Sequence, residues 1–166
     1  MSVLLWGPSG CGKTEVGRVL AQRMNIAFVD ADALHPRANV MKMARGDALD
    51  DIDRMPWLAR VAEQLIAWRA GGRRGVVACS ALRLDYRDIL RGADPALTAV
   101  YLQITREIAR KRLATRSGHF MPVALIDSQF ETLQPPHSAE DCLVIHSTGG
   151  VEEGARLIHE AILQQY

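Results

Sequence analysis

The chain has 166 residues, of which 48% are hydrophobic and 23% are charged, and its formal net charge is +1. This length suits one domain, and the composition excludes disordered and fibrous classes. Because positive and negative charges are nearly equal in number, there is no reason to expect a nucleic-acid or membrane partner. No apolar run approaches the roughly 18 residues of a membrane span. The three cysteines lack metal-ligand spacing, so we expect free thiols in a reducing cytoplasm.

Short, nearly continuous apolar runs alternate with longer amphipathic segments along the chain. The expected strands lie at 2–6, 26–30, 75–80, 97–102 and 142–146. The expected helices lie at 13–24, 54–70, 84–91, 106–116, 123–133 and 152–164. Continuous apolar runs are typical of strands buried on both faces of a parallel sheet. The alternation therefore predicts an α/β layer fold with right-handed crossovers, in a single domain over residues 1–166.

Two stretches depart from this alternation. The first, at about 32–58, begins with a long polar segment rich in charges of both signs. The second, at about 116–123, combines Arg116 and His119 with a glycine and a proline. Both would lie beyond strand or helix ends, where an α/β sheet collects ligands. We expect the first to be a substrate-binding region and the second to be a small lid.

The segment between the first strand and its helix fits the phosphate-binding pattern G-x-x-x-x-G-K-[ST]. Its glycines let backbone N–H groups turn toward phosphate oxygens, and the helix adds the positive end of its dipole. Lys13 would neutralise the β- and γ-phosphates, and the Thr14 hydroxyl would bind Mg²⁺. The residues expected to hold the nucleotide here are Gly7, Ser9, Gly10, Cys11, Gly12, Lys13 and Thr14.

Cys11 lies inside this loop and has two interpretations. It is either a small residue tolerated at a variable position, or a thiol whose pKa is lowered by the helix N-terminus and Lys13. The second interpretation predicts that alkylation inactivates the protein and that bound nucleotide protects it.

Two carboxylates, Asp30 and Asp32, close the second apolar run. Alternate residues at a strand end project in opposite directions, so one carboxylate could face Mg²⁺ and the other an acceptor hydroxyl. Phosphoryl transfer needs a group that positions the metal and one that orients, and can deprotonate, the nucleophile. We expect Thr14 and Asp30 at the metal and Asp32 as the base; the exchanged assignment and a simple solvated turn are the alternatives.

Arg112 and Arg116 stand four residues apart on one expected helix face. Like charges at that spacing repel, so an anion is expected between them. The triphosphate fits this place, where Arg116 would stabilise charge on the transferred phosphoryl group. A surface helix with salt bridges is the alternative.

Several blocks of the chain resemble the small P-loop gluconokinases. They are D-A-D-A-L-H-P at 30–36, C-S-A-L-R at 79–83, S-G-H-F at 117–120 and Q-F-E-T-L-Q-P at 129–135. The resemblance implies a three-layer P-loop kinase fold with a five-stranded parallel sheet of order 2-3-1-4-5, as in shikimate and nucleoside monophosphate kinases. It also implies that ATP, with Mg²⁺, phosphorylates D-gluconate at its 6-hydroxyl in the cytoplasm, and homodimers are common in the family.

Gluconate is a polyol with one carboxylate, so its pocket needs a cation and several hydrogen-bonding groups. Arg54 or Arg87 is expected at the carboxylate, because Arg forms bidentate pairs. His35 and Lys42 are expected at hydroxyls or at the transferred phosphate. A solvated surface charge is the alternative for each cation. The complete expected substrate set is Asp32, His35, Lys42, Arg54, Arg83, Arg87 and His119.

Two other functions fit parts of this pattern. Another small-molecule kinase of the same fold would act on shikimate or a nucleoside monophosphate, but the H-P and H-F blocks at 35–36 and 119–120 speak against it. A nucleotide-binding module without an acceptor pocket is a different class of protein. The charged stretch after the second strand, and Asp32 itself, argue against that reading.

Overall fold

The computed structural model of the chain describes residues 1–115 and 124–164. One parallel sheet has the strand order β2-β3-β1-β4-β5, which confirms the expected fold class and strand order. Its strands are β1 (Val3–Trp6), β2 (Ala27–Asp30), β3 (Gly75–Cys79), β4 (Thr98–Gln103) and β5 (Cys142–His146). The helices are α1 (Lys13–Met24), η1 (Ala31–Leu34), α2 (Arg37–Ala44), α3 (Asp51–Ala70), α4 (Leu84–Ala93), α5 (Arg106–Ala114), α6 (Ala124–Thr132) and α7 (Val151–Gln164).

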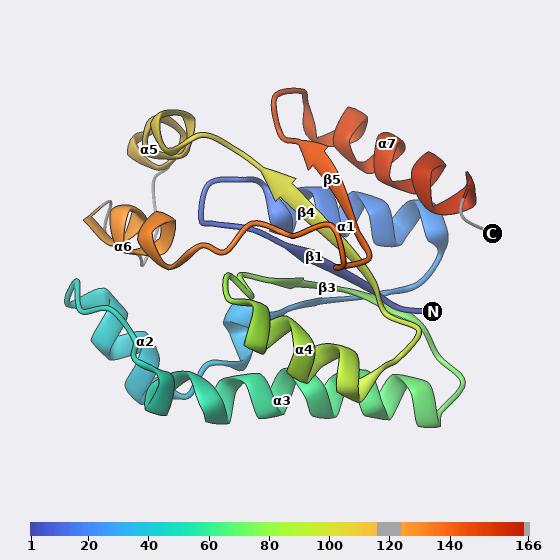
Figure 1. Cartoon of the computed structure of the whole chain (residues 1–166), viewed down its shortest axis with the longest axis horizontal. Coiled ribbons are helices and arrows are strands. Elements are labelled where there is room, and N and C mark those ends of the chain that lie inside the picture. Colours follow the sequence, from blue (N-terminus) through green and yellow to red (C-terminus); the bar gives the residue numbers. More distant parts are fainter. Residues whose placement is uncertain (116–123, 165–166) are drawn as a thin grey trace.

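Helices cover both faces of the sheet, as a parallel sheet requires. Figure 1 shows α3 and α4 on one face and α1 and α7 on the other. The remaining α-helices, α2, α5 and α6, gather at the end of the sheet where the strands finish. Every residue of β1 and β3 is buried, which explains why these strands are continuously apolar in the sequence.

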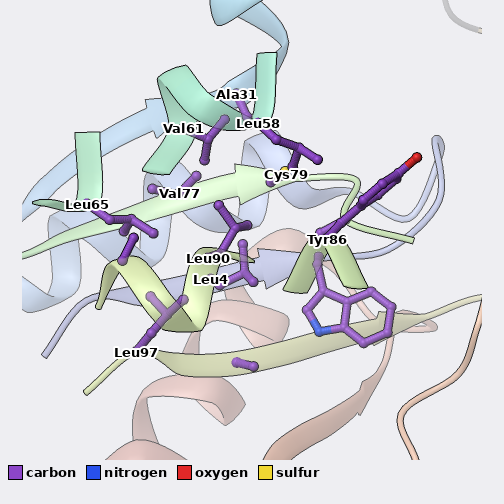
Figure 2. Packing of buried hydrophobic residues seen from close by; sticks show 14 of the residues in the cluster. Leu4, Ala31, Leu58, Val61, Leu65, Val77, Cys79, Tyr86, Leu90 and Leu97 are labelled. Carbon is purple, nitrogen blue, oxygen red and sulfur yellow. The ribbon is translucent and has the colours of Figure 1, made fainter. Parts of the chain in front are cut away.

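Neighbouring residues of a strand enter different cores because their side chains alternate across the sheet. Leu4 packs in the core beneath α3 and α4, whereas Leu5 packs in the core beneath α1 and α7. Figure 2 shows the first of these cores, where Leu58 and Leu65 of α3 and Leu90 of α4 surround Leu4. Burying each such side chain stabilises the fold by roughly 1.5–3 kcal/mol.

The polar stretch after β2 contains more helix than its sequence suggests. It contains η1 and α2, and α3 begins at Asp51 rather than at residue 54. The earlier start has a local cause. Asp50 accepts a hydrogen bond from Asp53 N, and the Asp53 side chain accepts one from Asp50 N, so the two form a capping box.

Two smaller expectations can be compared directly with the structure. Cys11, Cys79 and Cys142 are free, as predicted. Within residues 1–115 and 124–164, none of the helices combines the length and the apolar character that crossing a membrane requires.

Candidate active site

The loop between β1 and α1 has the tight backbone that its glycines predict. Gly10 and Gly12 have φ angles of +85° and +91°, in the left-handed region that side chains disfavour. A Cβ atom on Gly10 would also lie 3.0 Å from the backbone oxygen of Ala109 in α5. Glycine at this position therefore lets the loop lie directly against α5.

Lys13 begins α1 and folds back over the loop. Its Nζ donates a hydrogen bond to Pro8 O at 3.0 Å and lies 3.8 Å from Cys11 Sγ. Cys11 itself is fully buried in the core beneath α1 and α7. Its burial favours the interpretation of Cys11 as a small packing residue over that of an accessible, reactive thiol.

Thr14 and Asp30 lie side by side although sixteen positions separate them in the chain. The Thr14 hydroxyl donates to Asp30 Oδ2 at 2.7 Å, and Asp30 Oδ1 accepts from the backbone N–H of Asp32 at 3.0 Å. A hydroxyl and a carboxylate are the oxygen donors that Mg²⁺ prefers, and Mg²⁺ takes its other ligands from water and phosphate. Elsewhere in the described part of the chain, no group of three or more His, Cys, Asp or Glu side chains offers an alternative metal site.

Asp32, in η1, lines a pocket together with Lys13, and Asp30, at the end of β2, does not line it. The Asp32 side chain is accessible from this pocket, but the protein atoms around the pocket restrict its hydration and raise the pKa of the carboxyl. The positive charge of Lys13 opposes this rise, and the negative charge of Asp30 adds to it. A raised pKa makes Asp32 a stronger proton acceptor than an ordinary aspartate.

His35 lines the same pocket as a neutral ring. It stacks on Trp57 of α3, with ring centroids 4.3 Å apart, and burial together with the nearby Arg54 lowers its pKa to about 4. With this pKa, His35 can offer hydrogen bonds to hydroxyls but carries no charge at neutral pH. The Trp57 indole also donates to Ala31 O at 2.7 Å, which anchors the turn that carries Asp32.

Arg54 is the guanidinium that lies in this pocket. It lies over the Tyr86 ring, 5.8 Å from the centroid, and its Nη1 donates to the Tyr86 hydroxyl at 3.4 Å. The Tyr86 hydroxyl in turn donates to Asp51. Arg54 is thus held on one side by an aromatic ring and offers its remaining donors to the pocket.

Two other expected cations, Lys42 and Arg83, do not line the pocket. Lys42 Nζ lies 2.6 Å from Asp53 Oδ2, which raises the pKa of the lysine through that hydrogen bond. Arg83 contacts Asp85 at 2.6 Å and Asp51 at 3.2 Å. Both side chains are satisfied by carboxylates at the rim of the pocket.

Arg87 does not reach the pocket at all, which corrects the expectation that it binds the carboxylate of a substrate. Its side chain is fully buried beside Trp6, with the guanidinium carbon 4.0 Å from the ring centroid. It donates to both Glu140 carboxylate oxygens, at 2.5 and 2.9 Å, and to the backbone oxygens of Ala81 and Gln134. With its donors engaged in this way, Arg87 has a structural role.

A second cavity, of about 430 Å³, lies on the other side of the phosphate-binding loop, beside Arg112 and residues 145–151. Arg112 donates to Gly10 O at 3.2 Å and to Ser147 O at 2.7 Å, while Ser147 Oγ donates to Cys11 O at 2.6 Å. Arg112 therefore lies at the loop, as expected, but its contacts are to protein oxygens. Arg116, His119 and the expected lid at 116–123 lie outside the described residues.

Sequence reasoning missed the aromatic and amide residues of the pocket. Trp57, Tyr86 and Gln129 line it, although none was assigned a role. A signal for the first was present, because Trp57 follows Arg54 by three residues on one helix, and residues at that spacing share a face. Tyr86 and Gln129 come from two other helices, α4 and α6. Gln129 opens the Q-F-E-T-L-Q-P block that carries part of the family resemblance, but the sequence alone does not indicate that its side chain faces the pocket.

The fold and the phosphate-binding loop are those of a P-loop kinase, and a pocket lies beside the loop. A family model described as an AAA domain matches residues 3–136, and the chain belongs to that family. Shikimate kinase from Aquifex aeolicus vf5 shares the fold, with a TM-score of 0.72 and 16% identity over 99% of this chain and 98% of that one.

Relatives with higher sequence identity show which family of kinases the chain belongs to. The thermoresistant gluconokinase of Escherichia coli K12 is 41% identical over 86% of this chain and 82% of its own length. The gluconokinase of Gluconobacter oxydans 621H is 39% identical over 99% and 90%. The crystal structure of a gluconokinase from Sinorhizobium meliloti 1021 has a TM-score of 0.83 and 35% identity over 99% and 97%. The chain belongs to the gluconokinase family.

Proposed function

We propose that this chain transfers the γ-phosphoryl group of ATP to the 6-hydroxyl of D-gluconate, which gives 6-phospho-D-gluconate and ADP. The observation that carries the proposal is that Lys13 of the phosphate-binding loop and Asp32 face one pocket. Phosphoryl transfer needs this juxtaposition, since a cation must meet the phosphates and a base must meet the acceptor hydroxyl. The gluconokinase relatives support the choice of acceptor.

Each residue then has a defined task. The loop N–H groups and Lys13 bind the triphosphate and neutralise its charge. Asp32 accepts a hydrogen bond, and then the proton, from the attacking hydroxyl, aided by its raised pKa. Thr14 and Asp30 would hold Mg²⁺, which neutralises phosphate charge when it is bound.

The acceptor pocket suits a sugar acid. Arg54 offers a guanidinium to the carboxylate, and bidentate pairing with Arg would orient the chain of hydroxyls toward Asp32. Neutral His35 can exchange hydrogen bonds with hydroxyls without competing for the carboxylate charge. Lys42 and Arg83 would act, if substrate reaches them, only by giving up their present carboxylate partners.

Three further features complete the proposal. ATP with Mg²⁺ is the donor, and Arg112 and Arg116 flank its triphosphate, with Arg116 and His119 on a lid over about 116–123. The protein works in the cytoplasm, which agrees with its free cysteines. It assembles as a homodimer, a state suggested by the family resemblance.

An ADP-release assay with gluconate, shikimate, glycerate and nucleoside monophosphates as acceptors tests the function. We expect turnover with gluconate at least a hundredfold above the others, and a ³¹P spectrum that identifies a primary phosphate ester. Comparable turnover with shikimate or a nucleotide would overturn the choice of acceptor. ATP binding without turnover of any acceptor would favour the binding-module alternative.

A further inference from the structure

The side chain of Gln129 contacts the phosphate-binding loop from a helix far along the chain. Its Oε1 accepts a hydrogen bond of 2.7 Å from the backbone N–H of Ser9, the third residue of the loop. Gln129 also lines the acceptor pocket, together with Lys13 and Asp32. One amide group thus links the loop that binds phosphate to the pocket that binds the acceptor.

Helix α6, which carries Gln129, is fixed on both sides. On the nucleotide side, Asp127 pairs with Arg110 of α5, and Ile126 is fully buried in the core beneath α1 and α7. On the acceptor side, Leu125 packs with Met43 of α2 and with Leu49. Figure 1 shows α6 between α5 and α2 at the end of the sheet where the strands finish. The backbone of Gln129 is therefore held in place, and its side chain transmits that position to the loop.

The chemistry of the amide suits this place. A neutral carbonyl accepts the Ser9 N–H without adding negative charge next to Asp32 and the expected phosphates. A carboxylate of the same shape would accept the same hydrogen bond but repel a triphosphate. Alignment of the transferred group with its acceptor is sensitive to shifts of about 1 Å, so a contact that fixes the loop relative to the pocket affects the rate.

We propose that Gln129 is a positioning residue for phosphoryl transfer, which fixes the first turn of the phosphate-binding loop relative to the acceptor pocket through Ser9. The proposal rests on the proposed function and deepens it. It assigns the amide a role in kcat rather than in nucleotide affinity, because the remaining loop N–H groups and Lys13 still bind the triphosphate.

Two substitutions of Gln129 separate position from charge. Gln129→Met keeps the length of the side chain and removes the acceptor; we expect kcat to fall about tenfold while KM for ATP stays within twofold. Gln129→Glu keeps the acceptor and adds a charge; we expect KM for ATP to rise on the order of fivefold. Glu131→Gln, at an exposed position of the same helix, serves as the control and should match the wild type.

The amide NMR signal of Ser9 reports the contact directly. We expect its proton to move upfield and exchange faster in Gln129→Met, and to remain close to its wild-type position in Gln129→Glu. A lower melting temperature with unchanged kcat in Gln129→Met would reduce the residue to a structural role and overturn the proposal, as would an equal loss in Glu131→Gln. If Gln129→Met does not fold, Gln129→Ala, which also removes the acceptor, is measured in the same way, and an unchanged kcat or an unchanged Ser9 signal in that variant overturns the proposal.

Failure of this inference can be told from failure of the proposed function. The Ser9 signal is measured without any acceptor, and the kinetic comparison requires only that wild-type protein phosphorylates gluconate. Wild-type activity on gluconate with an unaffected Gln129→Met variant overturns the inference alone. Wild-type protein that does not phosphorylate gluconate overturns the function, whatever the Ser9 signal shows.

Discussion

Asp32 is the carboxylate that we propose as the proton acceptor in this pocket. Its pKa reflects two opposed influences, since the protein around the pocket raises it and Lys13 lowers it. The net rise makes the group a stronger base than an ordinary aspartate. Asp30, two residues away, is instead engaged by Thr14 and by the backbone N–H of Asp32, so the two carboxylates have different surroundings.

Asp32→Asn should lower kcat by about 10²- to 10⁴-fold, because the amide cannot accept the proton of the hydroxyl. In wild-type protein, kcat/KM should fall as the pH drops toward the pKa of Asp32, which lies above the ordinary value of 3.8. The residual activity of the variant should lack this acidic limb. Steady-state kinetics from pH 4 to 8 measure both effects, and an unchanged limb in Asp32→Asn would transfer the base role to another group.

His35, whose pKa is lowered in the folded protein, makes the stability of the fold depend on pH. The folded protein holds its imidazole neutral to about pH 4, whereas the unfolded chain takes up the proton near pH 6.5. Between these values the unfolded state binds more protons, so the free energy of unfolding decreases as the pH falls from about 6.5 to 4. Urea titrations at pH 7 and pH 5 should show a smaller loss in His35→Gln than in wild type. Equal losses would mean that His35 is protonated in the folded state.

At the scale of the elements, α4 and the segment after α6 are joined by charges buried between them. Arg87 of α4 and Glu140 are both nearly inaccessible, and Arg91 reaches the same carboxylate at 3.1 Å. Arg87 also donates to Ala81 O and Gln134 O, so it connects the turn after β3 to the chain that leads into β5. Since Leu82 and Tyr86 line the acceptor pocket, this pair supports the pocket wall from behind.

Glu140→Gln should lower the free energy of unfolding by about 3–5 kcal/mol, because it leaves the buried Arg87 without its counter-charge. Glu160→Gln is a matched control, since its pair with Arg156 is exposed on α7 and should change stability by less than about 0.5 kcal/mol. Chemical denaturation of the two variants provides the comparison. Equal free energies of unfolding for the two variants would show that other groups stabilise the charge of Arg87 when Glu140 is replaced.

In the whole molecule, the site lies at one end of the sheet, away from the two hydrophobic cores. The two cores fill the space between the sheet and its covering helices, whereas the loop after β1 and the turn after β2 supply the polar groups. Ligand binding should therefore stabilise the fold without rearranging its packing.

ATP with Mg²⁺ at a hundred times its Kd should add about 2.7 kcal/mol to the free energy of unfolding and raise the Tm by roughly 5–10 °C. Lys13→Met should show a much smaller shift, because it lacks the charge that faces the phosphates. Differential scanning calorimetry with and without EDTA separates the contribution of the metal. Equal shifts in wild type and Lys13→Met would place the nucleotide away from this loop.

Local patterns predict the strands, most of the helices and the loop, but not η1, α2 or the environments of the charged residues. The apolar runs at β1 and β3 and the glycines of the loop carry their own periodicity or spacing, so the strands and the phosphate-binding site could be predicted. The burial of Arg87 depends on Glu140, 53 positions further along the chain. The neutrality of His35 likewise depends on Trp57 and Arg54, so neither property is visible in the neighbouring sequence.

The position of β1 in the sheet has a consequence for biosynthesis. Val3 is in register with Val76 on one side and with Thr98 on the other, so β1 gains its two neighbours only after β3 and then β4 have been synthesised. Until β4 has been synthesised, the backbone groups of β1 lack their final partners and its apolar side chains lack a cover. The centre of the sheet therefore stays incomplete until β4 has been synthesised, and nucleotide cannot assist folding before that point.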